Sequence, residues 1–412
     1  MGWHLRHFYS SPCVPVAMAR YFICVHYAVS IAAANGLVAT SQQAAQNNLL
    51  PCPKTLWKHH DPFDMKKYDV RTKRDIPFLK QIQKPVELTN EEAEFDWLQI
   101  NDSNLMNILH QHGALHFTNF SLPKSKQGFR SFVEALPLQA CEDSLQSIGV
   151  RSLLSKSNGV YQAVDSEKLS QTFIGLHNDC TYELAPPFAA FCCFEQAHKG
   201  GEFLLANGRE ILYNLDLDQI QKLFERSVRV RVAALPTPFL VNNIHENYFK
   251  KRLAWLIEKI VAWVLKTYIP ELRLETAYSS NRTMLQILEP KKSTINCHPR
   301  TGEPTFFSGI HSQSAYLQQI RAADAFQGVA MTDVFYAEET DDDGIAVRPM
   351  EVIESGVLDH IESVMKKHTI EVLMQPGDVV LLDSYQVLHG RDTFQGPREH
   401  GVIWLTNSYF SL

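Results

Sequence analysis

The sequence lacks several features that mark common metal- and nucleotide-binding proteins. Its eight cysteines in 412 residues include no Cys-x-x-Cys pair, which argues against a thiolate zinc site and a thioredoxin-like motif. No Gly-x-Gly-x-x-Gly segment follows an apolar run, so a dinucleotide-binding βαβ unit is not expected. Basic residues are not in excess, because 39 Lys and Arg stand against 45 Asp and Glu, a net charge of −6. We therefore expect no nucleic-acid partner.

Acidic residues are missing from the first 60 residues, which carry only four Lys or Arg side chains. An apolar, alanine-rich stretch over 21–40 lies within this region, but His26 and Asn35 interrupt it and argue against a permanent transmembrane helix. Two interpretations of residues 1–52 stay open, namely a removable targeting segment or a disordered extension. In either case we expect the folded domain over residues 53–412.

Short apolar or alternating runs, bounded by turn residues, dominate the rest of the chain. Strands are predicted over 113–120, 160–163, 171–176, 188–195, 202–206, 284–288, 369–374, 379–382 and 402–406. Helices are predicted over 127–136, 211–226 and 247–268, with Asn207 as a helix cap and the last helix as core cover or a dimer face. Strands at both ends and a helical insertion at about 207–280 predict a mainly β, α+β fold of the sandwich or jelly-roll type.

Two His-x-Asp triplets are candidates for metal binding. The first, His59-His60-Asp61, lies in a Pro- and Lys-rich stretch and is interpreted as a solvated loop. In the second, His177-Asn178-Asp179, an apolar strand leads into the triplet. Because side chains two apart on a strand share a face, His177 and Asp179 can approach one ion together. A further apolar run ends at His389, and two His with one carboxylate form the facial triad of non-haem Fe(II) oxygenases.

Several segments, taken together and in order, resemble the taurine dioxygenase/clavaminate synthase-like family of Fe(II)- and 2-oxoglutarate-dependent oxygenases. The resemblance covers about residues 100–412 and is carried by 177–187, 200–202 and 377–398, with weaker matches at 113–120, 298–307 and 342–345. It implies a double-stranded β-helix, a distorted jelly roll, with helices packed outside. It also implies an Fe(II) cofactor, 2-oxoglutarate and O2 as cosubstrates, and oxidation of a small molecule, by default hydroxylation, with release of succinate and CO2.

The resemblance also assigns roles to individual residues. His177, Asp179 and His389 correspond to the iron ligands. Arg398 corresponds to the residue that binds the distal carboxylate of 2-oxoglutarate, since the guanidinium fork matches a carboxylate, and Arg391 is its competitor. Three further residues are expected to face the substrate: Asn178, Tyr182 and His311.

One position departs from the family pattern, because Phe203 stands where members often carry a Thr that donates a hydrogen bond to the cosubstrate. A catalytically inactive binding protein on the same jelly roll therefore stays open. A separate alternative is a zinc-dependent enzyme with an open metal position. A homo-oligomer is a further option. Ferrous chemistry favours an intracellular site, in the cytoplasm or an organelle, whereas the N-terminal segment favours export or import.

Overall fold

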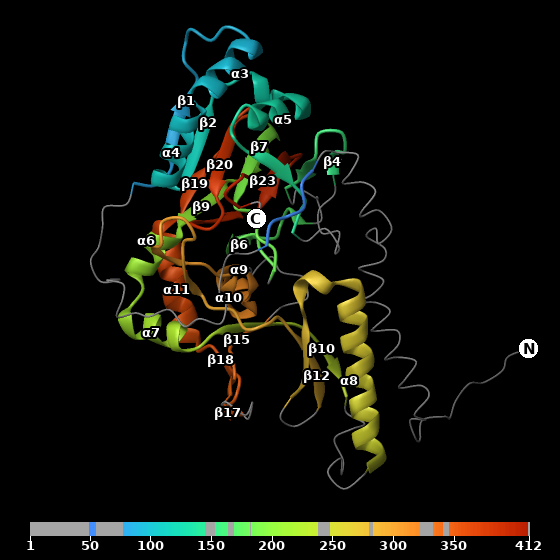
Figure 1. The fold of residues 1–412 in the computed structure, drawn as a ribbon. Coiled ribbons are helices and arrows are strands. Elements are labelled where there is room, and N and C mark those ends of the chain that lie inside the picture. Colours follow the sequence, from blue (N-terminus) through green and yellow to red (C-terminus); the bar gives the residue numbers. More distant parts are fainter. Residues whose placement is uncertain are drawn as a thin grey trace, which may run out of the picture.

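The computed structural model describes residues 49–54, 77–144, 153–163, 169–181, 183–237, 248–279, 283–321, 333–340 and 346–410. Two β-sheets that face one another form the centre of this part of the chain, with helices outside them (Figure 1). The mixed helix-and-strand composition expected from the sequence is confirmed. Tyr182, the triplet His59-His60-Asp61 and residues 1–48 lie outside the described residues.

The larger central sheet has eight strands, in the order β1-β2-β20-β7-β23-β5-β4, with β3 paired to β23. Its strands are β1 (Lys80–Gln83), β2 (Ala114–Thr118), β3 (Gln139–Cys141), β4 (Leu153–Ser155), β5 (Val160–Gln162), β7 (Phe188–Glu195), β20 (Val379–Asp383) and β23 (Glu399–Thr406). Its outer face is covered by α3 (Glu91–Ile100), α4 (Asp102–His112) and α5 (Lys126–Glu134). Because both faces are covered, the central strand β7 is a continuous apolar run rather than an alternating one.

The smaller central sheet has the strand order β19-β9-β21-β6. Its strands are β6 (Ile174–His177), β9 (Phe203–Asn207), β19 (Ile370–Val372) and β21 (Val387–Arg391). Between the two sheets, Phe191 of β7 packs against Phe203 of β9 and Trp404 of β23, with ring centroids 4.7 and 6.0 Å apart. The apolar run that ends at His389 is therefore two strands in different sheets, joined by a turn over 384–386.

Helices cover the outer face of the smaller sheet. They are α6 (Gly208–Asn214), α7 (Leu217–Glu225), α9 (Ile310–Gln313), α10 (Ala315–Arg321) and α11 (Ser355–His368). The helix predicted over 211–226 is two helices, because the chain leaves helical geometry at Leu215. Asn207 caps the first of them as predicted, since its side-chain oxygen accepts a hydrogen bond from the Arg209 N–H at 3.0 Å.

A third sheet lies beside the central pair and has the strand order β11-β12-β10-β15-β18. Its strands are β10 (Val228–Pro236), β11 (Glu275–Tyr278), β12 (Met284–Leu288), β15 (Asp333–Tyr336) and β18 (Glu351–Val352). The region 207–280, expected to be helical, thus also contributes two strands. Short pairs complete the described strands: β8 (Lys199–Gly200) with β22 (Phe394–Gln395), β13 (Ile295–Cys297) with β14 (Pro304–Phe306), and β16 (Glu339–Thr340) with β17 (Ala346–Arg348).

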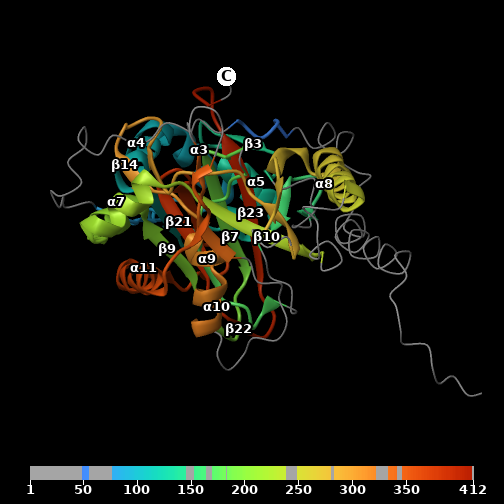
Figure 2. The same ribbon diagram turned by 90° about the horizontal axis from the view of Figure 1, so that it is seen from below.

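The long helix α8 (Tyr248–Tyr268) stands against this third sheet, on the opposite side of the molecule from α11 (Figures 1 and 2). One side of it packs Ile257 and Val261 onto the sheet. Its other side exposes Trp255 and Trp263, which are 58% and 63% exposed. The helix therefore covers a core with one face only, and the expected homo-oligomer stays a prediction. No helix in the described ranges combines the length and apolarity needed to cross a bilayer.

Candidate metal centre and cavity

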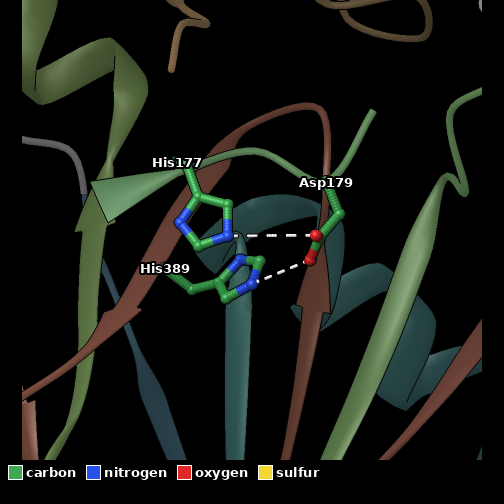
Figure 3. Close-up of side chains that lie close together, drawn as sticks. All are labelled: His177, Asp179 and His389. Carbon is green, nitrogen blue, oxygen red and sulfur yellow. Dashed lines mark ion pairs between the residues drawn. The ribbon is translucent and has the colours of Figure 1, made fainter. Parts of the chain in front are cut away.

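The pairing of two strands places the two candidate histidine ligands together. β6 and β21 are antiparallel neighbours, and His177 lies directly opposite His389 in their register. Directly opposed residues of an antiparallel pair point to the same face, so both imidazoles point toward the space between the sheets. Their ring centroids are 4.7 Å apart, at an interplanar angle of 43° (Figure 3).

Asp179 completes the cluster from outside the strand. β6 ends at His177, so the strand periodicity that predicted a shared face does not extend to Asp179. Its carboxylate nevertheless lies 2.8 Å from His389 Nε2 and 3.9 Å from His177 Nε2 (Figure 3). One ligand atom from each of the three side chains lies within 4.8 Å of the other two. The structure thus brings together the three residues that the sequence singled out.

A hydrogen bond and ring contacts set the orientations of the two imidazoles. The His177 Nδ1–H donates to the Gly175 carbonyl at 2.8 Å, which leaves the Nε2 lone pair facing Asp179. Such an outer hydrogen bond sets the tautomer and orientation of a metal-binding histidine. The His389 ring packs against Phe191 and Phe203, with centroids 4.9 and 5.9 Å away. Aromatic rings therefore limit the movement of the second histidine.

The chemistry of this donor set fits a divalent first-row transition metal. Two imidazole nitrogens and one carboxylate, supplied from one side, are the ligands of non-haem Fe(II) sites. Asp179 and His389 are each 6% exposed, so the ligands are held inside the protein. A cavity borders the cluster at His177 and Asp179, which gives a small molecule access to this part of the site. His177, Asp179 and His389 are thus the residues that would hold the iron.

This cavity has a volume of about 360 Å³ and is bordered by His177, Asn178 and Asp179. Its other walls come from β10 and from residues in the ranges 289–294 and 307–313. The Asn178 Nδ2 donates to the carbonyls of Ser384 and Val387 at 3.0 and 3.1 Å, which fastens the turn between β20 and β21. Its Oδ1 has no hydrogen-bond partner among the described residues. The volume suits a small molecule. Asn178 lines the cavity, and its contact with a substrate stays a prediction.

Two buried arginines follow His389, and their partners differ. Arg391 donates to the carbonyls of Leu169, Thr172 and Asp392 at 2.9, 3.2 and 2.8 Å, so its guanidinium fastens backbone segments. Its two terminal nitrogens, Nη1 and Nη2, both donate in these bonds. We therefore interpret Arg391 chiefly as a brace between β21 and the segment before β6.

Arg398 occupies the position immediately before β23. Its Nε donates to the Gly201 carbonyl at 3.3 Å, and its Nη2 donates to His400 Nδ1 at 3.1 Å. Gly201 has a φ of +77°, and a Cβ there would lie only 3.1 Å from the arginine side chain. Burial, and then the neighbouring Arg398 and Arg391, lower the pKa of His400 well below its usual range. A neutral His400 can accept the arginine hydrogen bond, which holds the side chain in place.

His311 has a different environment from the one expected of a substrate-facing residue. Its Nδ1 accepts the Leu176 N–H at 2.8 Å, and its Nε2 lies 2.8 Å from Glu362. It is buried and is not among the described residues that line the cavity. Both ring nitrogens are thus used inside the protein, next to the strand that carries His177, so this placement gives no support to substrate contact by His311.

Sequence reasoning missed two charged residues on the far wall of the cavity. Glu289 and Lys292 line it and form an ion pair of 2.9 Å. Both belong to the polar segment Glu289-Pro290-Lys291-Lys292, which has the composition of an ordinary turn. No spacing or motif distinguishes such a segment from a solvated loop. Its place on the cavity wall becomes visible only in the structure.

Known proteins resemble this chain over most of its length. The dapdiamide synthesis protein DdaC of Enterobacter agglomerans is 21% identical over 302 residues, which cover 73% of this chain and 84% of that protein. The crystal structure of PvcB from Pseudomonas aeruginosa aligns with a TM-score of 0.44 and 13% identity, over 81% of this chain and 87% of that one. The structure of AAD-2 in complex with Mn(II) and N-oxalylglycine aligns with a TM-score of 0.42 and 13% identity, over 81% and 97%.

A family model matches the chain directly. Residues 84–404 match the description "Taurine catabolism dioxygenase TauD, TfdA family", which is well over half of the chain. The matched range contains the three candidate ligands and Arg398. The expected enzyme class and the expected cofactors, Fe(II) and 2-oxoglutarate, are thereby confirmed. The chain belongs to the TauD, TfdA family of Fe(II)- and 2-oxoglutarate-dependent oxygenases.

Proposed function

We propose that this protein hydroxylates a small molecule bound in the cavity beside His177 and Asp179. The observation that carries the proposal is the convergence of two imidazoles and one carboxylate at the border of a cavity of about 360 Å³. We also propose that the two facing central sheets are the double-stranded β-helix that the family resemblance implies. Residues 53–412 then form one domain, with the third sheet and α8 attached to it.

The overall reaction balances with O2 as the oxidant. O2 takes up four electrons, two from a substrate C–H bond and two from the oxidative decarboxylation of 2-oxoglutarate. One oxygen atom enters the new alcohol and the other enters succinate, and CO2 is released. Bound ferrous iron supplies the ability to activate O2.

The chain's own side chains hold the reactants. His177, Asp179 and His389 would hold the metal, and His177 and Asp179 border the cavity in which a substrate would lie. Phe191 and Phe203 pack behind the His389 ring and keep water from that side of the centre. Phe203 cannot donate a hydrogen bond, so cosubstrate binding depends on a cationic side chain instead.

Arg398 is our choice for the distal carboxylate of 2-oxoglutarate. The lack of a side chain at Gly201 lets Arg398 pack directly against its backbone, and a neutral His400 orients the guanidinium. Arg391 already donates three hydrogen bonds to backbone carbonyls. A planar guanidinium that binds a carboxylate with two parallel hydrogen bonds is the strong form of this contact.

Turnover assays test this function. Purified protein is expected to convert 2-oxoglutarate to succinate only when Fe(II) and O2 are both present. Calorimetry with Fe(II) and 2-oxoglutarate tests for an inactive binding protein, and activity assays without O2 test for a zinc enzyme. An inactive binding protein, which Phe203 brings into consideration, would fail to bind the cosubstrate, and a zinc enzyme would show metal-dependent activity without O2.

A further inference from the structure

The far wall of the cavity carries an ion pair between oppositely charged side chains. Lys292 Nζ donates to Glu289 Oε2 at 2.9 Å, and both residues line the same cavity as His177 and Asp179. Their side chains are 24% and 12% exposed, so the pair is largely withdrawn from bulk water. The Gln313 amide donates to the other oxygen of Glu289 at 3.5 Å and also lines the cavity.

The backbone holds this charged pair rigidly. The Glu289 N–H donates to the Val230 carbonyl at 2.8 Å, and Lys292 exchanges two hydrogen bonds with Val228, of 3.0 and 2.8 Å. The segment is thus tied at both ends to β10, a strand of the third sheet. Side chains on such a tied segment are preorganised for binding, which reduces the entropy lost when a ligand is fixed.

The charged pair and the metal ligands share one cavity. Cys180, adjacent to Asp179, lines it together with Glu289 and Lys292. A ligand held by the pair therefore lies in the same enclosed space as the proposed metal centre.

The apolar lining shows where the rest of a ligand would lie. Ile174, Val228, Val230, Phe307 and Ile310 contribute apolar surface around the charged pair. An anion without a cation would draw Lys292 away and leave the mostly buried Glu289 carboxylate without its cation, which is costly. A ligand that carries both charges can pair with both residues at once.

From these observations we infer that the cavity binds the zwitterionic head group of an amino acid, with its carboxylate on Lys292 and its ammonium group on Glu289. The apolar part of the ligand then extends along the lining toward His177 and Asp179. This inference rests on the proposed function for its chemistry, but binding of the head group does not require turnover.

The test uses the proteinogenic α-amino acids as probes, each compared with its N-acetyl and carboxamide forms. At least one free amino acid is expected to raise succinate formation about tenfold or more above the rate without substrate, and its blocked forms are not. Thermal-shift and calorimetric titration of the metal-free protein should show the same preference, since a ligand that binds only the folded state stabilises it.

Two variants and a matched control locate the site. Lys292→Met and Glu289→Gln should each weaken binding of the free amino acid about tenfold or more, which corresponds to about 1.4 kcal/mol. Lys291→Met is the control, because Lys291 donates to the Glu338 carbonyl at 2.7 Å and is not among the residues lining the cavity. It should bind like the unmodified protein.

The outcomes separate this inference from the proposed function. Absence of succinate formation under all conditions contradicts the oxygenase function, and the titrations of metal-free protein still test the head-group site. The inference is overturned if no free amino acid binds, if the blocked forms bind equally well, or if both variants bind as tightly as the control.

Discussion

The two walls of the cavity are built in different ways. On the metal side, His177 and His389 come from neighbouring strands whose backbone register sets them directly opposite one another. On the far side, Glu289 and Lys292 come from a turn hydrogen-bonded to the start of β10, the central strand of the third sheet. The first wall is built on regular strand pairing and the second on a single turn, and we propose that the first carries the chemistry and the second selects the ligand.

The largest expected effect comes from removing a proposed metal ligand from the wall built by β6 and β21. His389→Ala deletes one imidazole, and we expect turnover of 2-oxoglutarate to fall by more than about 100-fold, since even the outer partners of metal ligands cost about 10–100-fold when changed. Succinate formation measures the effect. His116→Gln is a control. His116 lies on β2, pairs with Asp378, and is not among the residues that line the cavity. Equal turnover in both variants would contradict the assignment.

The second test compares the two arginines. Arg398→Met removes the guanidinium proposed to bind 2-oxoglutarate, and we expect its KM for 2-oxoglutarate to rise about 10- to 100-fold, the loss of a charge-assisted hydrogen-bonded pair. Arg391→Met should instead lower thermal stability, because its three backbone carbonyls lose their donor. Titration of 2-oxoglutarate for both variants checks this. The reverse pattern would transfer the role to Arg391.

A third test concerns the support behind β6. Burial lowers the pKa of His311, which the nearby Glu362 only partly opposes. Burial would raise the pKa of Glu362, but hydrogen bonds from His311 and Arg321 outweigh it and bring that pKa to about 2. The unfolded chain therefore binds more protons than the folded one in two ranges, below pH 6.5 for the histidine and below about pH 4.5 for the glutamate.

Stability should consequently fall as the pH drops below 6.5, by up to about 1.4 kcal/mol per pH unit for the histidine. Chemical denaturation between pH 5 and pH 8 measures this slope. His311→Leu should flatten it in the upper part of that range, because the titrating group is gone. An unchanged slope in the variant would show that other groups govern the acid sensitivity.

The smallest expected effect is at the start of α6. Asn207→Ala removes the side-chain acceptor for the Arg209 N–H, and loss of such a cap costs about 1 kcal/mol. Denaturant unfolding measures the loss, with Asn207→Asp as the control that keeps an acceptor. A loss far above this value would indicate that Asn207 has a further role at the end of β9.

Regular features of the fold could be predicted from the sequence. β7 was predicted with its observed bounds, because a buried central strand is one continuous apolar run. The alternating stretch Val228-Arg229-Val230-Arg231-Val232 has the strand pattern of β10, but it lies in a region where helical periodicity dominates and is not among the predicted strands. The break at Leu215 was also missed, since helical periodicity continues across it.

The residues of the site also fall into those that could be predicted from the sequence and those that could not. His177, Asp179 and His389 could be found because their spacing on apolar runs is itself a signal. The predicted cluster is observed, but the shared strand face that predicted it does not reach Asp179, because β6 ends at His177. Lys292 and Glu289 could not be found, because a charged turn becomes a binding wall only through its position against β10.

The most direct test of the central claim is an anaerobic calorimetric titration of Fe(II) into the protein and into Asp179→Ala. We predict one ion bound per chain, with affinity reduced by about 100-fold or more in the variant, since the only carboxylate of the three-residue cluster is gone. Binding of Fe(II) with equal affinity and stoichiometry by both proteins would show that His177, Asp179 and His389 are not the metal centre.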